Sequence, residues 1–395
     1  MAVSGNKKGI LPAACIVAGN GIGSGVMAIP YYVSHAGIAG AAAAFAAAYI
    51  VSVLMHFMIA HMAVKTGDHT GVLDIFNRYL FRGRPGSALR IVFFVLLVVV
   101  LTANLAAYIS GASEIFTELL PVGSVIVKIV FFLCAALVVL AGLGAVCTSE
   151  TVSMALMGFI LLFMVGFSLL NTKEVISIPL SGGIAEWAAA YGMIMFSFSA
   201  IFAVPQVVDY LGSKTEQTDK GISGKAPGGV RTAIWLGLLF NLIISVTVAV
   251  CTVITSSEVT GIAIVGWAEA VGGTIRILGS VFIVFAMLTS FWSIGLASAD
   301  IVAGQTHLGR EPSFVIATVP ALILTLTVSS GFTDYLKLVG GIVAIIISLM
   351  AVPSFLICMK EEPGEGIMKY EGSKAVAAFL FIMYVIMAVG SCISV

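Results

Sequence analysis

Apolar runs long enough to cross a lipid bilayer recur along the whole chain. A membrane-spanning helix needs about 20 apolar residues, and we count eleven such runs in the 395 residues. Their approximate spans are 10–36, 37–64, 89–113, 124–147, 151–171, 186–211, 231–254, 275–303, 313–330, 334–359 and 374–394. Because helices satisfy all of their backbone polar groups internally, the runs predict an all-α polytopic membrane protein with eleven transmembrane helices.

The composition agrees with a lipid environment and argues against several classes of function. Hydrophobic residues make up 60% of the chain and charged residues only 10%, with a mean hydropathy of +1.14. The formal net charge is zero, which gives no reason to expect nucleic-acid binding. No cluster of His, Cys, Asp or Glu has the spacing of a metal or catalytic site, so we expect no enzyme, no cofactor and no obligatory protein partner.

The charges outside the spans predict the orientation. If the N-terminus is cytoplasmic, the inner segments carry 15 Lys and Arg residues and the outer ones carry 4, as the positive-inside tendency requires. We therefore expect a multi-pass protein of the cell (inner) membrane, with its C-terminus outside. The inner loop 65–88 is suited to a short interfacial helix around Asp74–Phe81, and the loop 212–230 has the composition of a flexible linker.

Two of the spans contain signals that interrupt a helix. The first span has four glycines between Gly19 and Gly25, followed by Pro30. Irregular backbone within a membrane is tolerated only where it lines a cavity or is buried in protein. The sixth span contains the stretch Phe196–Pro205, which ends, like the interrupted stretch of the first span, in Ala, a β-branched residue and Pro. Isolated glycines are equally consistent with close helix packing, but two matching interruptions favour two broken helices.

The two interrupted spans indicate an internal repeat. Pro30 and Pro205 are 175 residues apart, close to the spacing between later pairs of spans. The chain therefore divides into a five-helix repeat (9–172), a second five-helix repeat (184–359), and a cytoplasmic linker with the eleventh helix (360–395). Because five is odd, the second repeat is inverted. Inverted repeats with broken first helices point to a transporter whose substrate site lies between the repeats.

At this point the sequence resembles the amino acid, polyamine and organocation transporter superfamily, in its amino-acid/auxin and aromatic amino-acid permease branches. The residues that carry the resemblance are Gly19–Gly25 with Ala28–Tyr31, and Phe196–Phe198 with Val204–Pro205. The resemblance implies the five-plus-five inverted-repeat fold, alternating access, and amino-acid transport driven by a sodium or proton gradient.

By position, the resemblance assigns the substrate site to the two breaks. Amides at Gly23, Ser24 and Gly25 would face the substrate carboxylate. Carbonyls of Asn20 or Gly21, and of Ser197, Phe198 or Ser199, would face the ammonium. Asn104 and Tyr108 lie one helical turn apart and share a face; there the tyrosine hydroxyl would complete a gate, or would simply pack against a neighbouring helix.

The resemblance also suggests an ion site. Ala286, Thr289 and Ser290 match the sodium-site segment of sodium-coupled members, in which two carbonyls of the first broken helix, here Gly19 and Ile22, complete the ligands. Hydroxyls that bond back to their own helix are the alternative. The fifth span, 151–171, has no ionisable side chain, and no Asp or Glu lies in the middle of any span. Since such groups usually mark proton relays, sodium is favoured over protons, with His56 and His61 expected near the inner end of the second span.

The substrate is expected to be a neutral amino acid. No fixed charge lies near the predicted site, so a charged substrate side chain would be buried without a partner. Phe198, Ile201, Phe202 and Trp292 are candidates for an apolar pocket that suits aromatic or branched side chains, although packing explains these residues equally well. A sensor or a channel on the same fold is the alternative to coupled transport.

Overall fold

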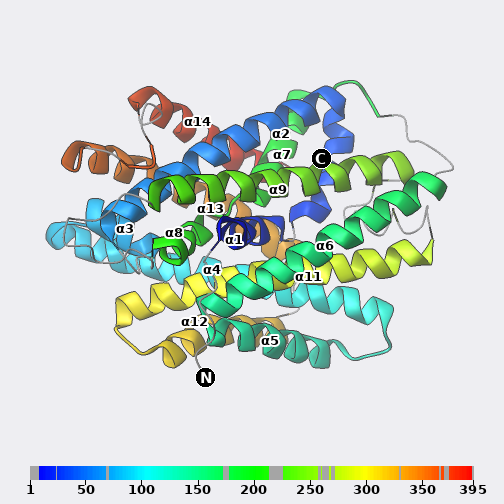
Figure 1. Cartoon of the computed structure of the whole chain (residues 1–395), viewed down its shortest axis with the longest axis horizontal. Helices are drawn as coiled ribbons and strands as arrows, with labels where there is room; N and C mark the ends of the chain where they lie inside the picture. Colours follow the sequence, from blue (N-terminus) through cyan, green and yellow to red (C-terminus); the bar gives the residue numbers. More distant parts are fainter. Residues whose placement is uncertain are drawn as a thin grey trace.

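The computed structural model describes residues 9–23, 25–67, 71–171, 178–212, 226–256, 259, 267, 272–328, 331–363, 366–368 and 373–393. Apart from the turns and short connections, these residues form helices, and they contain no strand (Figure 1). The helices are α1 (Ile10–Ile22), α2 (Gly25–Thr66), α3 (Val72–Tyr79), α4 (Gly83–Leu119), α5 (Ser124–Ala141), α6 (Leu143–Asn171), α7 (Ile184–Ser197), the 3₁₀ turn η1 (Ile201–Ala203), α8 (Val204–Gly212), α9 (Ala226–Thr255), α11 (Gly273–Thr306), α12 (Arg310–Thr327), α13 (Phe332–Glu361) and α14 (Lys374–Ser391).

The number of helices agrees with the predicted all-α membrane fold. Within the described part of the chain, eight helical segments are long and apolar enough to cross a membrane. Together with α1, α12 and α13 they account for the eleven predicted spans, because α2 contributes to two of them. Large apolar side chains point outward from α4, α5 and α6, as at Val92, Leu137 and Leu162, which are 66%, 69% and 74% exposed. A lipid environment is the solvent that such surfaces need.

The first broken helix is confirmed. Its second half and the second span together form one helix, α2. α1 ends at Ile22, and Gly23 has a φ of +23°, a conformation that L side chains rarely adopt. α2 then begins at Gly25, continues past Pro30, and turns at Gly37, where φ is +76°. The first span is therefore α1 plus the start of α2, and the second span is the remainder of α2.

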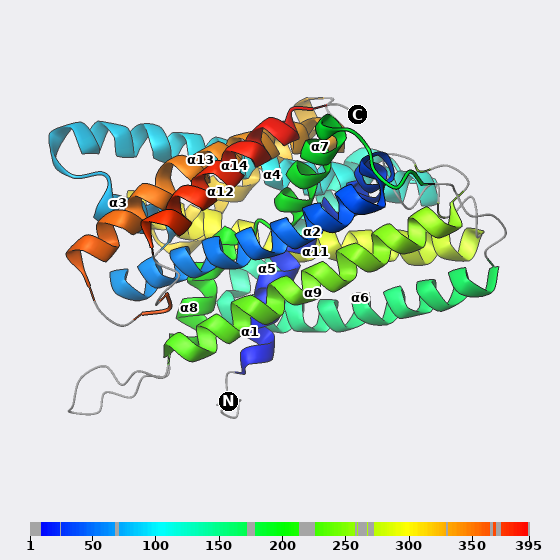
Figure 2. The same cartoon turned by 90° about the horizontal axis from the view of Figure 1, so that it is seen from above.

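The second broken helix is also confirmed. α7 ends at Ser197, residues Phe198–Ala200 are not helical, and the chain resumes as η1 and α8. Figure 1 shows α1 at the centre of the bundle, where it contacts α6, α8, α9 and α11. In the second view, α2 and α9 run alongside each other (Figure 2). Every residue of α1 from Ala13 to Ile22 is buried, so the break in α1 lies inside protein.

One predicted boundary is wrong in a way that matters for function. The fourth span was expected to continue to residue 147 and the fifth to start at 151. Instead, α5 ends at Ala141 and α6 begins at Leu143, because Gly142 adopts a φ of +100° and reverses the chain in a single residue. Residues 143–150, including Glu150, therefore belong to the fifth membrane helix.

The predicted interfacial helix is present as α3, between the second and third spans. Its N-terminus is capped by Asp74, whose Oδ2 accepts a hydrogen bond of 3.0 Å from the Gly71 amide. Most of the predicted flexible linker, 213–225, lies outside the described residues. α1–α6 fall within the first predicted repeat, and α7–α13 fall within the second except that α13 continues to Glu361. The repeat boundaries themselves stay a prediction.

Candidate functional site

The two helix breaks lie against each other, and glycines permit the contact. The Ser197 hydroxyl donates to the Gly21 carbonyl at 3.4 Å, and the Asn241 side-chain amide donates to the Ser197 carbonyl at 2.7 Å. A Cβ on Gly25 would lie only 2.9 Å from the Ser197 Cβ and 3.1 Å from its Cα. Any side chain at Gly25 would therefore push the two breaks apart.

A cavity of about 20 Å³ lies at this junction. Eight of the predicted substrate residues line it: Asn20, Gly21, Gly23, Gly25, Asn104, Tyr108, Ser199 and Phe202. Three lining residues were not predicted: Phe196, Ile294 and Val343. The cavity has room for roughly one water molecule, so an amino acid enters only if lining side chains move.

The other predicted residues have different positions. Ser197, Phe198 and Ile201 are buried beside the cavity but do not line it, and Ser24 lies outside the described residues. The Ser197 carbonyl is occupied by Asn241, and the Phe198 carbonyl accepts from the Ala200 amide at 3.0 Å. Of the three sixth-span carbonyls proposed for the ammonium, that of Ser199 belongs to a residue that lines the cavity.

Three side-chain oxygens that border the cavity have no hydrogen-bond partner among the described residues. They are Asn20 Oδ1, Asn104 Oδ1 and Ser199 Oγ, all buried. The amide group of Asn20 is oriented by Ser293, because its Nδ2 donates to the Ser293 hydroxyl at 2.9 Å. Buried polar atoms are rarely left unpaired. The cavity therefore suits a ligand that brings several hydrogen-bond donors, such as an ammonium group.

Another part of the cavity lining is suited to an anion. α2 begins at Gly25, beside the cavity, and the first amides of a helix have no partner within it. Such an N-terminus carries a partial positive charge that favours a carboxylate. The Tyr108 hydroxyl and Ser290 Oγ lie at 3.5 and 2.7 Å from the point that a Cβ on Gly23 would occupy. The predicted gate residue thus faces the first break.

Four of the five predicted ion-site residues come together beside the first break. Ser290 Oγ donates to the Gly19 carbonyl at 2.9 Å, and Thr289 Oγ1 approaches the carbonyls of Gly19 and Ala286 at 3.2 and 2.9 Å. Ile22, the fifth residue, is buried at the end of α1. Their role as sodium ligands stays a prediction, but the oxygens form one cluster between α1 and α11.

An acidic residue that was not predicted from the sequence lies at this cluster. Glu150 on α6 is fully buried, and in the described part of the chain neither carboxylate oxygen has a hydrogen-bond partner. Its carboxylate fills the space that a Cβ on Gly19 would need, and Thr289 Cβ lies 3.1 Å from the same point. The expectation that the fifth span lacks an ionisable side chain is therefore wrong, because its start was placed eight residues too late.

A second missed residue supports the sixth-span break. His56 was expected near the inner end of its span, but it is fully buried against α7. Its Nε2 accepts from the Ala200 amide at 3.1 Å, and its Nδ1 lies 2.6 Å from the Ser52 carbonyl. These contacts fit a neutral ring protonated at Nδ1. His56 thus gives the Ala200 amide, which also donates to the Phe198 carbonyl within the break, a second acceptor from another helix.

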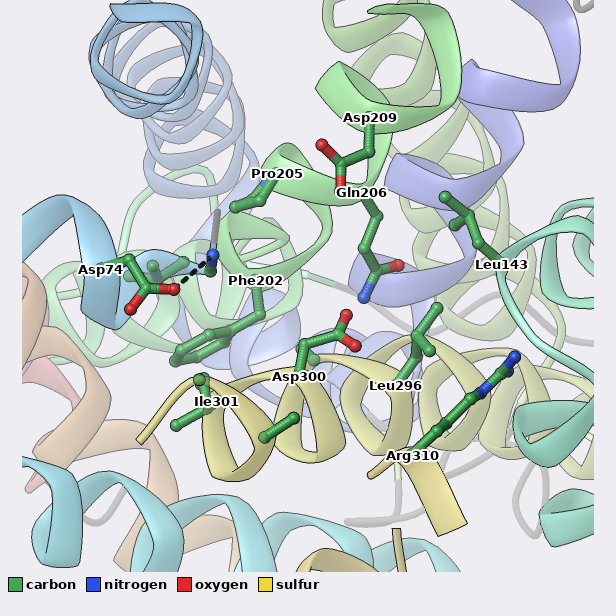
Figure 3. Close-up of a pocket in the computed structure, with 15 residues that line it drawn as sticks. Asp74, Leu143, Phe202, Pro205, Gln206, Asp209, Leu296, Asp300, Ile301 and Arg310 are labelled. Atoms are coloured by element: carbon green, nitrogen blue, oxygen red, sulfur yellow. Dashed lines mark hydrogen bonds between the residues drawn. The ribbon is translucent and has the colours of Figure 1, made fainter. Parts of the chain in front are cut away.

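A second cavity of about 390 Å³ lies next to the first (Figure 3). Its polar lining comes mainly from Asp74, Gln206, Asp209, Asp300 and Arg310. In Figure 3 the carboxylates of Asp209 and Asp300 flank Gln206. Burial raises the pKa of Asp74, which lies on the interfacial helix α3, and the hydrogen bond from Gly71 partly opposes this shift.

Phe202 separates the two cavities, because it lines both. A hydrogen-bonded connection runs beside it: Gln206 Nε2 donates to the Ser293 carbonyl at 2.8 Å, and Ser293 Oγ accepts from Asn20 at 2.9 Å. Residues of the larger cavity are thus linked to the first break through α11.

Comparison with known proteins decides the family. The family model of the tryptophan/tyrosine permeases matches residues 6–391. The chain belongs to the tryptophan/tyrosine permease family. No curated protein matches the sequence. The fold of the permease is similar to that of Mhp1, a nucleobase-cation-symport-1 family transporter solved in a closed conformation with bromovinylhydantoin bound. The TM-score is 0.69, with 15% sequence identity over 97% of this chain and 90% of that one.

Family and fold together make the permease a secondary transporter and not an enzyme. They confirm the predicted class of protein and the transporter fold. Within the described residues, no three His, Cys, Asp or Glu side chains gather in a way that could hold a metal ion.

Proposed function

We propose that the permease is a cation-coupled symporter for neutral amino acids, aromatic ones among them, that works by alternating access. The observation that carries this proposal is the central cavity, whose described lining includes both unpaired acceptors and the start of a helix. A zwitterionic amino acid supplies the matching groups, an ammonium for the acceptors and a carboxylate for the amides. The family to which the chain belongs supports an aromatic substrate.

The remaining lining of the cavity supports a neutral side chain. Phe196, Phe202, Ile294 and Val343 are apolar, and no Asp, Glu, Lys or Arg is among the described lining residues. An ionised side chain would lose its hydration there without gaining a partner. An aromatic ring gains contact area and edge-to-face geometry with Phe196 and Phe202.

The coupling ion is proposed as sodium, on the strength of the oxygen cluster formed by Gly19, Ala286, Thr289 and Ser290. Oxygen ligands of this kind suit a hard cation. A proton is the alternative, because Glu150 removes the argument that no carboxyl lies within a span. A sensor or channel of the same fold would bind the substrate without accumulating it.

The charge bias of the loops supports a cytoplasmic N-terminus and an outer C-terminus in the cell membrane. In that orientation the larger cavity, lined by Asp74, Asp300 and Arg310, belongs to the cytoplasmic pathway. Phe202 then separates the substrate site from the cytoplasmic side.

Competition binding tests the proposal on purified protein. Labelled tryptophan is displaced by unlabelled tryptophan, by tryptamine, which lacks the carboxylate, and by indole-3-propionate, which lacks the ammonium. A hydrogen bond to a charged group contributes about 1.5–3 kcal/mol, so we expect each analogue to bind at least tenfold more weakly. Equal competition by indole-3-propionate would refute the assignment of the ammonium to the unpaired acceptors.

A pair of variants on one helix sharpens the test. Asn104→Ala removes one unpaired acceptor of the cavity and should weaken tryptophan binding about tenfold. Ser113→Ala is the control, because its hydroxyl bonds to the Ser124 carbonyl away from the cavity. Equal affinity in the two variants would exclude Asn104 from the site.

A further inference from the structure

Glu150 is a buried acid that the substrate site does not use. It lies on α6 with no exposed surface, and within the described residues neither oxygen has a hydrogen-bond or ion-pair partner. An unpaired carboxylate in a membrane interior is costly by several kcal/mol. A group retained there is expected to have a positively charged partner for at least part of the working cycle.

The position of Glu150 indicates which other groups a positively charged partner of its carboxylate would contact. Its carboxylate packs directly on Gly19, whose carbonyl accepts from Ser290 at 2.9 Å and from Thr289 at 3.2 Å. The Thr289 hydroxyl also lies 2.9 Å from the Ala286 carbonyl. Three helices, α1, α6 and α11, thus bring one carboxylate and several neutral oxygens to one point.

No basic side chain neutralises this carboxylate in the described structure. Cys15 of α1 is the titratable neighbour that interacts electrostatically with it. The other titratable groups on α6 and on the helices that contact it are Lys128, Cys134, Cys147, Asp209, Tyr210, Arg231, Cys251, Arg276 and Asp300. Lys128 donates to the Thr325 carbonyl at 2.7 Å, and Arg231 stacks on Phe57. A monovalent cation would make the cluster neutral, whereas a divalent one would leave it charged.

We propose that the carboxylate of Glu150 binds the coupling cation, together with the oxygens of Gly19, Thr289 and Ser290. This inference rests on the proposed transport function and adds to it the one charged ligand of the ion site. Sodium and a proton share the relevant chemistry, because either neutralises the carboxylate.

The geometry also explains how cation binding would reach the substrate. Ser290 Oγ bonds to the Gly19 carbonyl and lies beside Gly23, which lines the substrate cavity. A cation held between Glu150 and Ser290 draws α6 and α11 toward the end of α1. It thereby fixes the break whose following helix, α2, presents amides to the substrate carboxylate.

Uptake into proteoliposomes tests the inference. Wild type, Glu150→Gln and the control Glu311→Gln, an exposed carboxylate at the start of α12, are compared in three arms. These are an inward sodium gradient at equal pH, an inward proton gradient without sodium, and no gradient. Exchange of labelled for unlabelled tryptophan is measured in parallel, since exchange needs no net cation movement.

We expect Glu150→Gln to lower gradient-driven accumulation at least tenfold, with a smaller loss of exchange, and Glu311→Gln to behave as wild type. The arm that drives wild-type uptake identifies the cation. Accumulation by Glu150→Gln at the wild-type level would overturn the inference. A wild type that accumulates in neither arm would instead refute the proposed transport function.

A second variant keeps the test decisive if Glu150→Gln does not fold. Glu150→Asp retains the charge but withdraws it by one methylene group from Gly19 and Thr289. We expect its half-saturating concentration of the driving cation to rise at least fivefold. An unchanged cation dependence in Glu150→Asp would overturn the inference.

Discussion

Adding one methyl group at Gly25 tests whether the junction of the two broken helices is the binding site. In the structure, a Cβ at this position would lie 2.9 Å from the Ser197 Cβ and 3.1 Å from its Cα. Because one of these atoms belongs to the backbone, rotation of a side chain does not relieve the contact. Gly25→Ala must therefore shift α2 relative to α7.

The expected magnitude follows from the cost of overpacking. An extra methyl group in a packed interior costs about 1–3 kcal/mol. If about 2 kcal/mol of this cost falls on the conformation that binds substrate, the dissociation constant for tryptophan rises roughly 30-fold. The assay is equilibrium binding of labelled tryptophan to purified protein, with the unfolding temperature measured on the same samples.

Gly166→Ala is the matched control for Gly25→Ala. Gly166 also lies in a membrane helix, but a Cβ there meets nothing within 4 Å. The affinity of Gly166→Ala for tryptophan and its unfolding temperature should stay at wild-type values. The reasoning is refuted if Gly25→Ala binds tryptophan within about twofold of the control, because the substrate would then not depend on the junction.

Three further predictions follow from other contacts. Phe202→Ala should join the two cavities that this ring separates, so gradient-driven accumulation should fall more than tryptophan binding does; an unchanged ratio of the two would argue against a gate. Asn241→Ala leaves the buried Ser197 carbonyl without its donor, which costs about 1–3 kcal/mol of folding stability. It should therefore lower the unfolding temperature more than the control Thr247→Ala, because the Thr247 hydroxyl bonds back to its own helix. Burial raises the pKa of Asp74 in the folded protein above its usual value of 3.8. The folded state should therefore lose stability as pH rises from 3.8 to the higher pKa of the folded state. Asp74→Asn should abolish that loss in a series of thermal-unfolding measurements at different pH.

The fold was predictable because its main determinants are local. Length and hydrophobicity mark the spans, and the glycines before Gly25 and the similar endings at Pro30 and Pro205 mark the two breaks. Eight of the residues proposed for the substrate site do line one cavity. Six of them lie at or beside the two backbone breaks, which are encoded in short motifs, whereas Asn104 and Tyr108 lie on α4.

The contributions from distant helices were not predictable in the same way. Ile294 on α11 and Val343 on α13 join the cavity through packing, and no local pattern distinguishes them from other apolar residues. Phe196 is different, because it lies on the broken helix α7 within a quoted motif but was not proposed for the site. His56 was judged by its distance along a span, whereas its role depends on where Ala200 lies in three dimensions.

Glu150 was missed for a more instructive reason. The polar run around Cys147–Glu150 resembles an interhelical loop by composition, but the chain turns five residues earlier at Gly142, where φ is +100°. A glycine that permits a one-residue turn was the available signal. Once the turn is placed there, the acid moves into the membrane helix and the argument against proton coupling fails.

The most direct test of the account is accumulation of labelled tryptophan in proteoliposomes that contain only this permease. The account predicts saturable accumulation above the external concentration under an inward sodium or proton gradient, and its collapse when the gradient is dissipated. Binding without accumulation under either gradient would contradict coupled transport and would indicate a sensor. Passive equilibration that does not saturate would indicate a channel.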